Sequence, residues 1–176
     1  MHRQVLFVVL GLVLTGTLWA GGPHDVIVGG GEIGWLENTV QPQVQCAGGE
    51  PIEVFPYCSP ETRHILARDE VQIWAPASLS DPVAGLLDGP ITFTVNCNFD
   101  PNLRGPCWGT FTWDVPDTCS WEGHWVSPVM DLITYESEIT MEGFGDCGDL
   151  GDLHLRVEGF SNPGDWYITI QVRISG

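Results

Sequence analysis

The chain of 176 residues is long enough for one ordinary domain with a real core, and its formal net charge of −17 makes it strongly acidic. It has 23 acidic residues against six arginines and no lysine. This balance argues against nucleic-acid and anionic-membrane partners, whose phosphate groups would be repelled. Two interpretations remain, a solubilising surface typical of exported proteins and an electrostatic lure for cations.

Residues 1–20 predict a secretory signal peptide. Arg3 supplies the positive start, residues 5–14 are apolar, and Ala20 is a small residue at a suitable cleavage point. No later apolar run approaches the roughly 20 residues that a membrane-spanning helix needs. We therefore expect a secreted or periplasmic protein with no membrane span after the signal is removed. In an exported chain, the six cysteines predict three disulfides.

Residues 21–60 are rich in glycine, proline and glutamine and predict an irregular N-terminal arm with at most one or two edge strands. The glycines of residues 29–34 match a dinucleotide-binding fingerprint, but no helix of useful length can follow them before Pro42. We interpret this stretch as a glycine loop. Further on, Cys46 and Cys58 enclose a short segment that a local disulfide would close.

Residues 61–176 predict a single antiparallel β-barrel of about eight strands in a meander, stapled by disulfides. Apolar and polar residues alternate along its strands, and no amphipathic helix of useful length occurs. Several strands contain glycine, which suits a sharply coiled sheet. The predicted strands cover residues 70–75, 91–95, 109–113, 121–127, 132–141, 153–158 and 167–174.

The alternation also sorts the two faces of the sheet. The apolar positions, Trp113, Trp121 and Trp125 among them, predict the core. The opposite positions include Glu122, His124, His154 and Arg156, which we expect to face water. In the alternative arrangement, part of this polar face lines a cavity and these residues form a site.

Cys97 and Cys107 flank a predicted hairpin mouth, so their sulfurs can face each other. We therefore expect the pairs Cys97–Cys107 and Cys46–Cys58 and, by elimination, Cys119–Cys147.

The order of glycine-broken aromatic strands in residues 105–113, 121–125 and 141–156 resembles the meander of allene-oxide-cyclase-like barrels, a shape shared by dirigent proteins. The resemblance covers roughly residues 65–176. It implies an eight-stranded barrel with a central pocket, often assembled into a homo-oligomer, that binds or folds up a hydrophobic small molecule. The disulfides depart from this group, and no functional residue carries over.

Three sets of residues are candidates for chemistry. Glu122 and His124 share one strand face and could form an acid–base pair, although two adjacent surface residues would look the same. A second set, Asp146, Asp149 and Asp152, has spacing that would suit Ca²⁺, but an acidic turn is the simpler interpretation, and we expect no metal or cofactor. The ligand-binding candidates for a hollow barrel are Trp74, Trp113, Trp125, His154 and Arg156.

The sequence thus favours a secreted, noncatalytic barrel that binds a small hydrophobic ligand or acts as an extracellular interaction module. The alternative is a cyclase- or dirigent-type enzyme acting on a polyene or phenolic substrate. An apolar pocket with one or two buried polar groups would favour the enzyme, whereas a filled barrel would disfavour both ligand-based functions.

Overall fold

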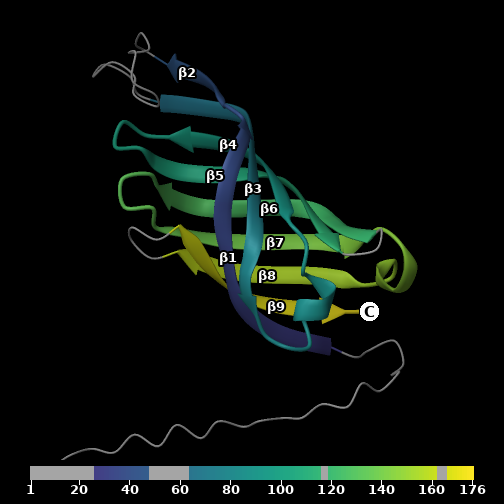
Figure 1. Ribbon diagram of the computed structural model, residues 1–176. Coiled ribbons are helices and arrows are strands. Elements are labelled where there is room, and N and C mark those ends of the chain that lie inside the picture. The colour runs from purple at the N-terminus through teal and green to yellow at the C-terminus, as the bar shows by residue number, and fades with distance from the viewer. Residues whose placement is uncertain (1–25, 48–63, 116–118, 162–165) are drawn as a thin grey trace, which may run out of the picture.

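The computed structural model describes residues 26–47, 64–115, 119–161 and 166–176, which form one nine-stranded antiparallel sheet (Figure 1). In chain order its elements are β1 (Val26–Val40), β2 (Gln43–Ala47), β3 (His64–Leu79), the 3-10 helix η1 (Ala84–Leu86), β4 (Ile91–Phe99), β5 (Arg104–Val115), β6 (Cys119–Asp131), β7 (Ser137–Gly145), the 3-10 helix η2 (Gly148–Leu150), β8 (His154–Ser161) and β9 (Tyr167–Ser175).

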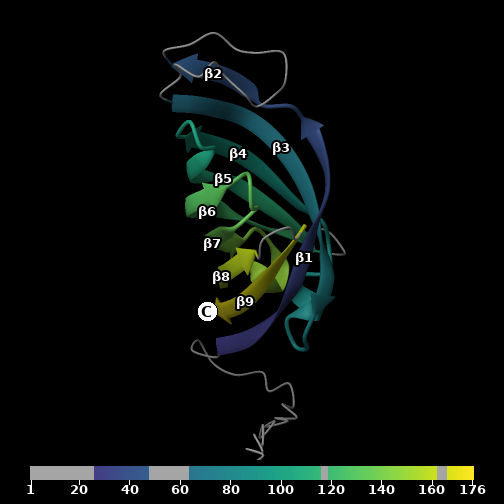
Figure 2. The same ribbon diagram turned by 90° about the vertical axis from the view of Figure 1, so that its left-hand side faces the viewer.

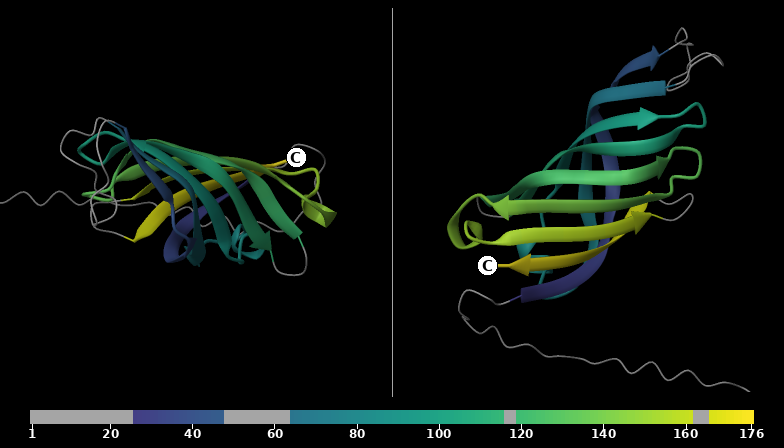
Figure 3. Two further views of the ribbon diagram at one scale, coloured as in Figure 1. Left: turned by 90° about the horizontal axis from the view of Figure 1, so that it is seen from above. Right: turned by 180° about the vertical axis from the view of Figure 1, so that it is seen from behind.

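The sheet closes into an eight-stranded barrel, which confirms the predicted fold class. Strands β3 to β9 follow one another as a meander, and β1 closes the ring by pairing with β9 on one side and β3 on the other. β2 lies outside the ring, paired with β3. β1 and β3 cross the other strands steeply, and Figures 2 and 3 show them arching over the sheet that β4 to β9 form.

The expectation of an irregular arm is wrong for Val26–Val40, which is a barrel strand rather than a loop or an edge. Its glycines allow very close approach to both neighbours. A Cβ atom at Gly30 would lie 2.7 Å from the Ile170 carbonyl oxygen, and one at Gly31 would overlap the Ser78 carbonyl oxygen. These positions look irregular in the sequence because the tight closure of the ring requires residues without a side chain.

The predicted strand at residues 132–141 is also wrong at its start, because β7 begins at Ser137. Residues 132–136 form the turn after β6. The Asp131 carboxylate accepts hydrogen bonds from the backbone N–H groups of Ile133 and Thr134, at 2.8 and 3.0 Å. These two bonds lower the pKa of Asp131 and stabilise the turn.

Inward and outward residues alternate along the meander strands as the sequence predicts. β4 is the clearest case, because every second residue from Ile91 to Phe99 is buried. The predicted core tryptophans are buried as well, at Trp113, Trp121 and Trp125.

One end of the barrel, which we call the filled end, is closed by the segment between β3 and β4. Val83 and Leu87 of this segment are fully buried. The Trp113 indole N–H donates to the carbonyl oxygens of Leu87 and Gly89, both at 3.0 Å, and the Trp121 indole N–H donates to that of Leu86 at 2.9 Å. Two core rings therefore hold the segment in place through its backbone.

Two of the three predicted disulfides are present, Cys97–Cys107 and Cys119–Cys147. Cys97 and Cys107 stand directly opposite each other in the β4–β5 ladder, which confirms the disulfide predicted across this hairpin. The third predicted pair, Cys46–Cys58, includes Cys58, which lies outside the described residues.

Candidate functional site

The other half of the barrel, which we call the hollow end, contains a cavity of about 170 Å³. Its walls come from β3, β4, β6, β7 and β9 and from the turn after β6, and they are mostly apolar. The lining residues are Ile65, Ala67, Glu70, Gln72, Trp74, Phe93, Val95, Cys97, Phe99, Trp125, Met130, Leu132, Ile139 and Ile168.

A β-bulge in β3 creates the polar part of this wall. The pairing of β3 with β4 shifts register between Ala67 and Glu70, where Asp69 has a φ of 56°. Without the shift, the alternation that buries Ile65 and Ala67 would continue through residues 69, 71 and 73. The extra residue instead brings Glu70, Gln72 and Trp74 to the cavity wall.

Glu70 is the centre of a hydrogen-bonded cluster. Its Oε1 accepts from Asn38 Nδ2 at 2.6 Å and from Gln72 Nε2 at 3.0 Å. Each amide oxygen accepts in turn from an indole N–H. Trp35 Nε1 donates to Asn38 Oδ1 at 3.1 Å, and Trp74 Nε1 donates to Gln72 Oε1 at 3.0 Å. The cluster therefore joins β1 to β3 across the seam where the barrel closes.

Burial raises the pKa of the Glu70 carboxyl above its ordinary value, and the hydrogen bonds from Gln72 and Asn38 only partly counter that effect. No other lining residue carries a charge. Among the described residues, no donor reaches Oε2. One acceptor atom of the carboxylate thus remains for a further partner.

Aromatic rings form the wall around this carboxylate. Trp74 meets Phe93 edge-on, with ring centroids 6.3 Å apart and an interplanar angle of 83°. Trp125 also meets Phe93 edge-on, with ring centroids 5.7 Å apart and an interplanar angle of 80°. The Trp125 indole N–H donates to the Thr94 carbonyl oxygen at 3.0 Å, which fixes that ring. These three rings line the same cavity, each tryptophan nearly at a right angle to Phe93, and we call them the aromatic box.

A second aromatic group lies at the hollow end. Trp35 packs against Trp166 with centroids 5.3 Å apart, and Trp166 packs against Tyr135 at 5.1 Å. Trp166 and Tyr135 are exposed. Trp35 thus belongs to both groups, since its ring lies in this stack and its N–H donates to Asn38.

The predicted ligand-binding residues separate into three places. Trp74 and Trp125 line the cavity, whereas Trp113 lies at the filled end. His154 and Arg156 lie on the outer face, where the imidazole packs on Phe144 with ring centroids 5.0 Å apart. Arg156 pairs there with Glu142 at 3.3 Å and Glu158 at 2.8 Å.

Glu122 and His124 are both exposed on the outer face of β6, so the structure does not place them in the cavity of the hollow end. The polar residues of the cavity are Glu70 and Gln72, and Asn38 reaches the same cluster. Sequence reasoning missed all three. The signal that could have found Glu70 and Gln72 is the run Arg68-Asp69-Glu70, three charged residues in succession where a predicted strand begins.

In the acidic loop after β7, the Asp146 carboxylate is hydrogen-bonded to the neighbouring strand β6. Asp146 accepts hydrogen bonds from the Ser120 backbone N–H at 2.6 Å and from the Ser120 hydroxyl at 3.1 Å. Asp152 is exposed, and the side chain of Asp149 lies outside what the structure describes. Each oxygen of Asp146 therefore already accepts from β6.

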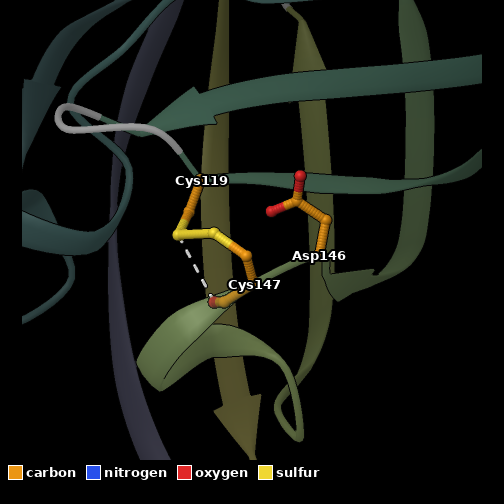
Figure 4. Close-up of side chains that lie close together, drawn as sticks. All are labelled: Cys119, Asp146 and Cys147. Carbon is orange, nitrogen blue, oxygen red and sulfur yellow. Dashed lines mark hydrogen bonds between the residues drawn. A yellow bond between two sulfur atoms is a disulfide. The ribbon is translucent and has the colours of Figure 1, made fainter.

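In the described part of the chain, Cys119, Asp146 and Cys147 form the one close group of residue types that bind metals. The two cysteines are joined as a disulfide, and Cys119 Sγ lies 3.4 Å from the Cys147 carbonyl oxygen (Figure 4). Metal-binding cysteines act as thiolates, and these sulfurs are not thiolates. The group therefore staples the loop and is not a metal centre.

Comparison with known proteins gives no relative, because no protein-family model, no curated protein and no solved structure matches this chain. No helix among the described residues is long and apolar enough to cross a bilayer. The cavity itself is therefore the feature that indicates function.

Proposed function

We propose that the protein is an exported, noncatalytic binding protein that holds a small, mostly apolar molecule in the hollow end of its barrel. The observation that carries this proposal is a cavity of about 170 Å³ inside the barrel, lined by aromatic and aliphatic side chains around one half-buried carboxyl. An apolar cavity of roughly 150 Å³ is large enough for benzene. The ligand we propose is therefore about the size of one ring with a short substituent.

Export is part of the same proposal. A disulfide joins two neighbouring strands and another anchors a loop, and disulfides persist in oxidising compartments. The signal peptide predicted for residues 1–20 lies outside the described residues.

A cyclase- or dirigent-type enzyme is the second candidate. Two observations favour it, the apolar cavity with the polar residues Glu70 and Gln72 in its wall and the raised pKa of Glu70. A carboxyl whose pKa lies closer to neutrality is a better general acid or base than an ordinary one. Against this function, Glu70 is the one titratable residue among those that line the cavity, so it has no acid–base partner there. We therefore place binding before catalysis.

Native mass spectrometry of protein purified from its own host tests the proposal. We expect a retained small molecule that is released unchanged on denaturation. The matched control is Ala67→Leu, which adds bulk to the cavity wall and should reduce the retained amount. A retained molecule that the folded protein converts into a product would favour the enzyme, and equal retention by wild type and A67L would contradict binding in this cavity.

A further inference from the structure

We infer that the ligand of this cavity is a small organic cation, an ammonium group attached to an apolar body, with its charge between Glu70 and the aromatic box of Trp74, Phe93 and Trp125. The inference rests on the proposed binding function and adds the chemical class of the ligand. Four features of the cavity lead to it.

The hydrogen-bond directions around Glu70 favour its ionised form. An indole N–H can only donate, so Trp35 and Trp74 fix the amide oxygens of Asn38 and Gln72 toward themselves. The NH₂ group of each amide is thereby directed at Glu70 Oε1, which accepts from both. A group that receives two fixed donors is held as an acceptor, and the carboxylate is the better acceptor.

Among the residues that the structure describes, this carboxylate has no cationic partner. Arg68 is the closest arginine along β3, but its guanidinium donates to the carbonyl oxygens of Ala67 and Cys97 and lies over the Trp108 ring, 5.1 Å from its centroid. Trp108 faces outward. A partly buried charge without a countercharge is unfavourable, so a cationic ligand would supply what the site lacks.

The aromatic box suits the same charge. Trp74 and Trp125 stand at 83° and 80° to Phe93 and line one cavity with it. The faces of such rings are negative and attract ammonium groups, and aromatic boxes of this kind bind alkylated ammonium ions. An anionic ligand would meet both the carboxylate and the ring faces unfavourably.

The whole chain adds a long-range attraction, because its net charge of −17 raises the local concentration of cations and repels anions. The attraction of cations by the acidic surface would thus lead to a specific binding group, the Glu70 carboxylate inside the barrel.

Three probes that share one ring and differ in charge test this inference, namely benzylammonium, benzyl alcohol and benzoate. Their affinities for the full-length mature protein are measured by isothermal titration calorimetry near neutral pH and at fixed ionic strength. We expect benzylammonium to bind about tenfold more tightly than benzyl alcohol, and benzoate to bind most weakly.

Glu70→Gln removes the charge while keeping the shape of the side chain, and Glu122→Gln removes the same charge from the outer face of β6 as the matched control. E70Q should abolish the preference for benzylammonium and leave benzyl alcohol within about threefold of wild type. E122Q should leave the preference unchanged. If E70Q does not fold, as judged by circular dichroism, the order of the three probes on the wild-type protein decides the question.

The possible failures are distinguishable. The cationic ligand would be contradicted if benzyl alcohol bound as tightly as benzylammonium, or if E70Q and E122Q lost the preference equally. Either result would leave the proposed binding function unaffected. No binding of any probe would overturn both.

Discussion

The two ends of the barrel use the same side chain for opposite purposes. At the filled end, Trp113 and Trp121 donate their indole N–H groups to backbone carbonyl oxygens of the segment that plugs the barrel. At the hollow end, Trp35 and Trp74 donate to the side-chain amides of Asn38 and Gln72. The bonds of Trp113 and Trp121 fix the plug, whereas the bonds of Trp35 and Trp74 orient the two amides toward Glu70.

The difference between the two ends shows how a small barrel can be stable and still keep space for a ligand. The fully buried plug residues Val83 and Leu87 contribute the packing at one end. The other end keeps its space because Glu70 and Gln72 occupy positions where a uniform barrel would have core residues. Four predictions test this division, from the largest expected effect to the smallest.

The largest effect should come from removing a ring at the filled end. Trp113→Ala leaves a fully buried cavity and two unpaired carbonyl oxygens, and should lower the free energy of unfolding by about 3–5 kcal/mol. Trp74→Ala should cost less than half as much, because that ring borders existing space. Urea denaturation of both variants measures the difference, and equal losses would contradict the division.

Added volume should also distinguish the ends. Val83→Phe overfills the plug, where Val83 already packs closely on Gly29, and should cost about 1–3 kcal/mol. Ala67→Leu extends into the cavity and should change the free energy of unfolding by less than about 1 kcal/mol. Chemical denaturation compares them. A67L losing as much stability as V83F would show that the hollow end is packed.

Glu70 should make the hollow end sensitive to pH. Its pKa in the folded state lies above the ordinary 4.5, so between the two values the folded state binds more protons than the unfolded state. The contribution of Glu70 to stability therefore falls as pH rises through this window. Glu70→Gln removes that dependence, so the stability of E70Q relative to wild type should increase from pH 4 to pH 8.

Thermal unfolding across this pH range measures whether the stability of E70Q relative to wild type increases with pH. Glu122→Gln, which removes a charge on the outer face, is the control. A relative stability of E70Q that decreases with rising pH would mean that the carboxylate is better stabilised in the folded state than unfolded.

The smallest effect is expected at the acidic loop near the filled end. Millimolar calcium should raise the melting temperature no more than sodium at matched ionic strength does, because both oxygens of Asp146 already accept from Ser120. Magnesium is a second comparison ion. A calcium-specific rise of several degrees that Asp149→Asn abolishes would establish a cation site there.

The alternation of the sequence predicted the barrel and the buried tryptophans because both depend on the two-residue period of a strand. The Cys97–Cys107 disulfide was predicted from its place at a hairpin mouth, and Cys119–Cys147 by elimination. The alternation failed at β1 and at the cavity for related reasons. Gly30 and Gly31 carry no side chain to alternate, so β1 looked irregular. The bulge at Asp69 reverses the phase of β3 and brings Glu70 inward, and a reversal of one residue leaves almost no trace in composition.

The pairing of β1 with β9 also governs how the molecule is assembled. Val26 lies opposite Ser175, so the first strand of the ring to be synthesised meets the last one. The ring cannot close until the whole chain is present, and contacts this distant in sequence slow folding of all-β domains to milliseconds or seconds. Until then β1 and β8 each have an unpaired edge that can capture another chain. The edges of β1 and β8 therefore stay open to pairing with other chains until β9 has been synthesised.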